Sequence, residues 1–178
     1  GAYCAEPGNA DRAPVGLGPA IHIAYAIPSD APDLFSSVGP SIAADVEAIE
    51  AWWRREDPGR VPRFDRYRAP CGLQLDVTRV RLSETTRYYE RFAVQTEMIL
   101  EDLERSGLES DSGIQLVYYG GPIADPDVCG AGAGDPEQMI GHTVVFLAHC
   151  TDRDRARIAT HEILRTLGAL PTGAPHPC

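Results

Sequence analysis

Runs of β-branched and aromatic residues alternate with long stretches of helical spacing, and this order restricts the fold of the 178-residue chain more than any other feature. The runs with strand character lie at residues 21–27, 73–82, 114–119 and 143–148. A change of phase near Thr78 indicates a bulge. Residues 41–56 and 85–106 place their apolar side chains on one helical face. We therefore expect an α+β fold with a small mixed four-stranded sheet and two long helices.

The remaining segments are rich in Gly, Pro and charged residues and are expected to lack regular structure. Residues 1–19 are predicted to form an extended N-terminal arm, and residues 169–178 a non-helical tail. Loops are expected at residues 28–40, 60–68 and 120–134. A chain of this length is long enough to bury one core, so we predict a single domain over residues 1–178.

A last helix is expected over residues 151–167, and it carries a histidine and glutamate pattern. In the zinc-peptidase pattern H-E-x-x-H-x-x-G, positions i and i+4 lie on one helical face and bind one metal ion, with the Glu beside the metal-bound water. His161, Glu162 and Gly168 occupy their positions here, and Gly168 is expected to end the helix. Arg165 stands where the second His would be, and a guanidinium offers no lone pair to a metal.

This region resembles the zincin metallopeptidases, in particular small secreted bacterial members whose motif reads H-E-x-x-H-x-x-G-A-x-P followed by A-P-H. The likeness is sharp over residues 161–176, and the order of elements extends it loosely back to Ile21. It implies that His161 and His176 are ligands of a zinc cofactor and that Glu162 is the general base. It also implies that peptides or proteins are the substrates or partners.

The sequence departs from the subfamilies of that resemblance at several positions. Pro171 stands where metzincins place a third His, and Met98 and Met139 both precede the motif, so neither supplies a downstream Met-turn. Catalytic zinc sites normally use three protein ligands. His142 and His149 are candidates for recruitment, although ordinary structural positions suit them better.

Three interpretations of the motif remain open. In the first, the protein is a zinc peptidase in which Glu162 activates water and Arg165 turns outward or stabilises the oxyanion. In the second, the protein is a zinc-free pseudo-peptidase that binds a partner, and Arg165 pairs with Glu162 on one helical face in place of the metal charge. In the third, the motif is accidental and its side chains do not converge.

The charge and the cysteine content limit the possible partners and the cellular compartment. A net charge of -10 argues against nucleic acid and anionic membranes as partners, and no apolar run approaches the roughly 20 residues that cross a bilayer. All 16 basic residues are Arg, which is typical of a high-GC bacterial source. The five cysteines are scattered, which favours disulfides and a secreted protein, although unpaired buried thiols are the alternative. Their pairing is left open: they are Cys4, Cys71, Cys129, Cys150 and Cys178.

Overall fold

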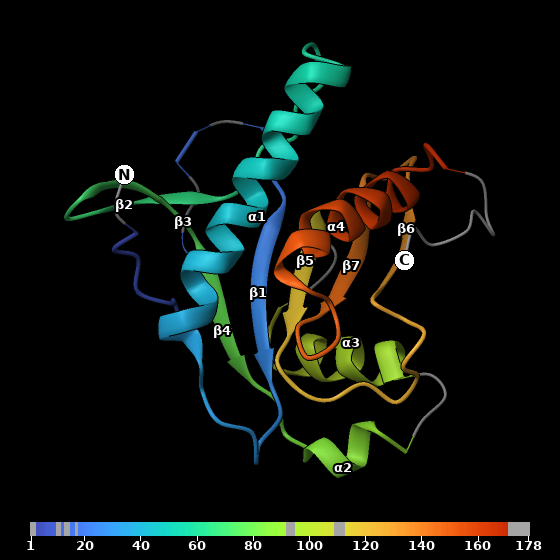
Figure 1. The fold of residues 1–178 in the computed structure, drawn as a ribbon. Helices are drawn as coiled ribbons and strands as arrows, with labels where there is room; N and C mark the ends of the chain where they lie inside the picture. Colours follow the sequence, from blue (N-terminus) through green and yellow to red (C-terminus); the bar gives the residue numbers. More distant parts are fainter. Residues whose placement is uncertain are drawn as a thin grey trace.

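The computed structural model describes residues 3–9, 12, 15–16, 18–91, 95–108 and 113–170. Its strands are β1 (His22–Ile27), β2 (Arg66–Ala69), β3 (Gly72–Leu75), β4 (Val77–Arg81), β5 (Ile114–Tyr119), β6 (Gly130–Asp135) and β7 (Ile140–Phe146). Its helices are α1 (Phe35–Glu56), α2 (Thr86–Tyr89), α3 (Gln95–Arg105) and α4 (Asp152–Thr166) (Figure 1). None of the described helices is both long and apolar enough to cross a membrane.

Within the described residues, five strands form one mixed sheet in the order β4-β1-β5-β7-β6. The strands β4, β1, β5 and β7 are parallel to their neighbours, and β6 pairs antiparallel with β7 at the edge. The mixed α and β character is as predicted, but the predicted four strands are one too few. The strand of this sheet that was not predicted is β6, which overlaps the predicted loop at residues 120–134 and ends at Asp135. Its sequence, GAGAGD, lacks the β-branched and aromatic residues by which strands are recognised.

The predicted strand at residues 73–82 is two strands that belong to different sheets. β3 pairs antiparallel with β2 in a two-stranded sheet, and β4 pairs parallel with β1. The division falls at Asp76 rather than at the bulge expected near Thr78. β2 includes Arg66, so the predicted loop at residues 60–68 ends in a strand.

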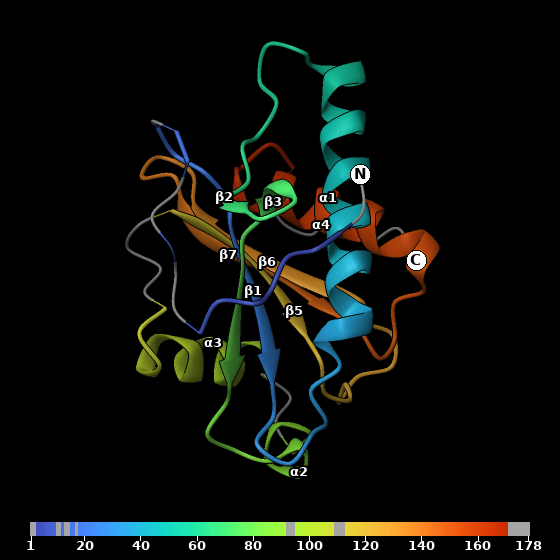
Figure 2. The ribbon, with the colours of Figure 1, turned by 90° about the vertical axis from the view of Figure 1, so that its left-hand side faces the viewer.

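The sheet lies between two helical layers. Figures 1 and 2 show α1 and α4 on one face and α3 on the other. Alternate residues of each central strand face opposite layers, as the strand period of two requires. In β5, Leu116 and Tyr118 belong to the core beneath α1 and α4, whereas Val117 and Tyr119 belong to the core beneath α3.

Two predicted helices have different bounds in the structure. α1 begins at Phe35 rather than at residue 41 and includes Pro40. Phe35 is buried, with its ring centroid 6.2 Å from that of Tyr25, so burial holds this first turn in the fold. The helix predicted over residues 85–106 is divided into α2 and α3, and residues 92–94 between them lie outside the described part of the chain.

The N-terminal arm covers the outer edge of the sheet. The Gly8 amide donates to the Val77 carbonyl at 3.0 Å, and the Arg79 amide donates to the Gly8 carbonyl at 2.7 Å. A disulfide between Cys4 and Cys71 attaches the arm to the turn between β2 and β3 across 67 residues of sequence. The arm therefore pairs with an edge strand that would otherwise expose its backbone groups.

Candidate functional site

The helix that carries the motif ends as its glycine predicts. Gly168 has φ of +69°, in the left-handed region that glycine adopts without strain. The Gly168 amide donates to the Arg165 carbonyl at 2.9 Å, and the Ala169 amide donates to the Leu164 carbonyl at 2.8 Å. This pair of hydrogen bonds is a Schellman motif. The predicted end of the helix is confirmed.

Two motif side chains, those of His161 and Arg165, lie close to the Glu162 carboxylate. Arg165 Nη1 is 3.7 Å from one carboxylate oxygen of Glu162, and His161 Nε2 is 3.9 Å from the other. The Glu162 side chain is fully buried, whereas the side chains of His161 and Arg165 are 13% and 21% exposed. His176, the other predicted zinc ligand, lies outside the described residues, as does Pro171.

Glu162 is buried because α4 packs directly on the glycine-rich edge strand β6. Gly130, Gly132 and Gly134 alternate along β6 and so present one face. A Cβ atom on these glycines would approach α4 side chains one turn apart, namely Ile158, Glu162 and Thr166. At Gly132, such a Cβ would lie 2.7 Å from the backbone oxygen of Glu162 and 3.1 Å from its Oε2. The absence of side chains on this strand face creates the space that the Glu162 carboxylate occupies.

Sequence reasoning missed this half of the site, although a signal was present. Glycine at every second position over residues 130–134 has the period of a strand with one bare face. The composition of the segment concealed that period.

Thr166 belongs to the same contact between α4 and the sheet. Its hydroxyl lies 3.2 Å from the His142 carbonyl and 2.9 Å from the Glu162 carbonyl.

The described residues do not by themselves supply the ligands of a zinc site. A catalytic zinc site takes three protein ligands and one open position. Across the described ranges, no group of three or more His, Cys, Asp or Glu side chains could hold a metal ion. His142 and His149 therefore do not complete such a group around His161. The guanidinium of Arg165 instead places a permanent positive charge beside the carboxylate.

His161 also borders a groove between α1 and α4. The groove has a volume of about 630 Å³, within the usual range for ligand pockets. Trp52 and Leu164 give it apolar surface, and Arg55 and Arg157 add positive charge. It thus combines apolar area with a few polar groups, as binding sites commonly do.

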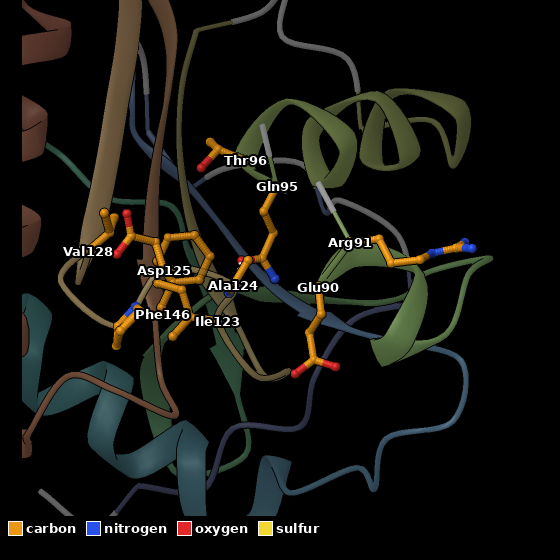
Figure 3. Close-up of a pocket in the computed structure, with 10 residues that line it drawn as sticks. Glu90, Arg91, Gln95, Thr96, Ile123, Ala124, Asp125, Val128 and Phe146 are labelled. Carbon is orange, nitrogen blue, oxygen red and sulfur yellow. Dashed lines mark hydrogen bonds between the residues drawn. The ribbon is translucent and has the colours of Figure 1, made fainter. Parts of the chain in front are cut away.

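A second cavity of about 430 Å³ lies beneath α3, where β7 ends at Phe146 (Figure 3). Gln95 reaches across it from the first turn of α3. Its amide nitrogen donates to the Pro122 carbonyl at 2.8 Å, and its amide oxygen accepts from the Ala124 amide at 2.8 Å. Gln95 therefore holds the loop after β5, and Figure 3 shows Arg91 directed away from the other lining residues. No sequence pattern predicted this cavity.

No protein-family model matches the chain, and no curated protein is significantly similar to it in sequence.

Proposed function

We propose that this protein is a zinc-free, zincin-like pseudo-peptidase that binds a peptide or protein partner and does not cleave it. The proposal rests on one observation: Arg165 Nη1 lies 3.7 Å from the carboxylate of the fully buried Glu162. Removing a carboxylate from water is costly unless a cation or donors compensate it. Arg165 supplies, as a fixed side-chain charge, the positive charge that a zinc ion would bring to the same place.

The surroundings of Glu162 argue against a role as general base. A general base must lie within hydrogen-bond reach of the proton that it removes. In the described structure the Glu162 side chain has no exposed surface and lies between α4 and β6. Substrate and attacking water would both need access that this packing denies. Zinc peptidase activity, with His161 and His176 as ligands, is the competing proposal.

The groove between α1 and α4 is the surface that we assign to the partner. Trp52 and Leu164 suit an apolar anchor residue, because a few side chains buried in well-packed pockets carry most of the binding energy at protein interfaces. Arg55 and Arg157 also line the groove and suit carboxylates of the partner. A short extended peptide with alternating apolar and acidic side chains therefore matches the groove.

The metal content of three variants tests the proposal. Protein purified without chelator is equilibrated with zinc, desalted and examined by native mass spectrometry. We expect no zinc on the wild-type protein or on Arg165→Gln, and about one zinc per chain on Arg165→His, in which a ligand replaces the guanidinium.

Two outcomes of this measurement would contradict the proposal. One zinc per wild-type chain, lost in His161→Ala, would establish a metal site and make peptidase activity the better proposal. Failure of Arg165→His to gain zinc would show that the likeness to zincins does not extend to the site.

A second arm of the experiment addresses the groove. The probe is an acetylated hexapeptide of alternating Leu and Glu, titrated against the Trp53→Phe variant so that Trp52 alone reports by fluorescence. We expect saturable binding that weakens in Arg157→Ala, and no binding of the matched Leu and Lys peptide. Equal binding of both peptides, or no change in Arg157→Ala, would remove the groove from the proposal.

A further inference from the structure

Two thiols meet at the point where β6 and α4 both begin. Cys129 directly precedes β6, and Cys150 is separated from α4 by Thr151 alone. Both carry free thiols in the described chain. The Cys150 Sγ donates to the Cys129 carbonyl at 2.8 Å, so the buried thiol lies against the residue that carries the other thiol.

The backbone holds these two cysteines together through a shared neighbour. The Phe146 amide donates to the Cys129 carbonyl at 3.0 Å, and the Cys150 amide donates to the Phe146 carbonyl at 3.1 Å. Phe146 is the last residue of β7 and is buried. The end of the buried strand β7 therefore holds the two cysteines next to each other. Their proximity does not depend on the conformation of an exposed loop.

We propose that Cys129 and Cys150 form a second intramolecular disulfide, made by exchange with an external disulfide such as oxidised glutathione. One cysteine thiolate attacks the donor disulfide and releases one donor thiol. The second cysteine thiolate then attacks the mixed disulfide and releases the other donor thiol. The protein loses two protons and two electrons, and the donor disulfide gains both and becomes two thiols.

The surroundings of the pair assign the order of these steps. Cys129 is half-buried and lines an open cavity of about 340 Å³ together with His149 and Asp154. Cys150 is only 5% exposed, and burial together with the adjoining Cys129 thiol raises its pKa. Since the thiolate is the attacking form, the accessible Cys129 reacts with the donor and the buried Cys150 resolves the mixed disulfide.

This disulfide would link the segments that directly precede the glycine-rich strand β6 and the motif helix α4. Gly130, next to Cys129, is the first of the three alternate glycines of β6 against which α4 packs. The cross-link would hold β6 against α4 and so maintain the enclosure of Glu162. The proposed disulfide does not depend on whether the protein binds zinc or a partner.

Peptide mapping of the Cys178→Ser variant tests the proposal. The folded protein is exposed to oxidised glutathione, denatured, alkylated with iodoacetamide, and digested with trypsin and a Glu-specific protease. Cleavage after Glu137 separates the two cysteines, so a linked pair appears as two joined peptides lighter by two hydrogen atoms. We expect this linked species in Cys178→Ser, beside the linked Cys4 and Cys71 peptides.

The control is Cys129→Ser in the same Cys178→Ser background. In this control Cys150 cannot form the proposed disulfide. After desalting removes the free donor and mild thiol exchange releases any donor still bound to Cys150, we expect Cys150 to be fully alkylated. Complete alkylation of both Cys129 and Cys150 in the parent variant, with Cys4 and Cys71 still linked, would overturn the proposal. Linkage of either cysteine to Cys4 or Cys71 would overturn it as well.

Discussion

At the scale of single residues, Glu162 and Arg165 are the pair on which the proposed function rests. The two residues are three positions apart on α4, so they share a helical face whatever lies around them. Under the proposed function, Arg165 occupies a position that would hold a neutral ligand in a zinc peptidase, and it provides a cation itself. The 3.7 Å separation between Arg165 Nη1 and Glu162 Oε2 supports that proposal.

Asp102 is a second buried carboxylate whose neighbours stabilise its charged form. Its oxygens accept from the Ser83 amide at 2.7 Å, from the Ser83 hydroxyl at 2.8 Å and from the Tyr89 hydroxyl, while Arg105 lies 3.2 Å away. Burial by itself would raise the pKa of Asp102. The hydrogen bonds from Tyr89 and Ser83, together with the charge of Arg105, outweigh burial and lower the pKa.

A lowered pKa in the folded state makes stability depend on pH in a defined direction. The contribution of Asp102 is present above the unfolded pKa of about 3.9 and is lost as pH falls through the folded pKa. We expect Asp102→Asn to lower the free energy of unfolding by about 1–3 kcal/mol at pH 7 and to reduce its decline below pH 4. Urea denaturation between pH 2.5 and 7 measures both effects. The control is Glu137→Gln on the exposed turn, which should change neither.

At the scale of elements, the packing of α4 on β6 depends on an unusual strand face. Three glycines in alternate positions let the helix backbone approach the strand backbone closely. Elsewhere in a strand, glycine costs conformational entropy and contributes no packing. At these positions of β6, glycine allows the close approach of α4.

Gly132→Ala tests whether that closeness is required. The added Cβ would lie 2.7 Å from the Glu162 carbonyl oxygen, a backbone atom that moves only if α4 moves. We expect a loss of about 1–3 kcal/mol in the free energy of unfolding, measured from the urea midpoint. Gly59→Ala is the matched control, because a Cβ there would lie 3.5 Å from Asp57 Oδ1 on an exposed turn. Equal or greater stability of Gly132→Ala would show that α4 does not require a bare strand face.

At the scale of the whole molecule, a buried ion pair joins the two helices on the motif side of the sheet. Arg155 Nε of α4 donates to Asp45 Oδ2 of α1 at 2.8 Å, and both side chains are almost fully buried. Tyr118 of β5 lies beside the pair, and burial together with the charge of Asp45 raises its pKa. These contacts link segments that are 110 residues apart in sequence.

Removing one charge of this ion pair should lower the free energy of unfolding more than replacing both charged residues with apolar ones. Asp45→Ala leaves the Arg155 guanidinium buried opposite an apolar side chain, and we expect it to lower the free energy of unfolding by about 3–5 kcal/mol. The double variant Asp45→Leu with Arg155→Met removes both charges and should recover most of that loss. Urea denaturation of the two variants and the wild type, at one pH and salt concentration, gives the comparison. A double variant no more stable than Asp45→Ala would show that the pair itself, and not the unpaired charge, accounts for the effect.

Local sequence patterns determined the elements whose residues have strong preferences of their own. Strands β1, β5 and β7 are marked by β-branched and aromatic residues, and α4 is marked at its end by Gly168. The i,i+3 spacing likewise placed Arg165 on the helical face of Glu162, as the structure shows. These features could be read from the chain because each depends on neighbours within a few residues.

Tertiary structure decided the features that depend on distant residues. β6 is a strand because β7 pairs with it and α4 covers it, although its own glycines and alanines favour no strand. α1 begins at Phe35 because that ring is buried against Tyr25, and the pairing of Cys4 with Cys71 required the arm to reach the β2–β3 turn. The burial of Glu162 is likewise a product of β6 and α4 together. The sequence by itself identified the residues of the motif, but the sheet edge beneath them determined that Glu162 is enclosed, because solvent access depends on packing between distant segments.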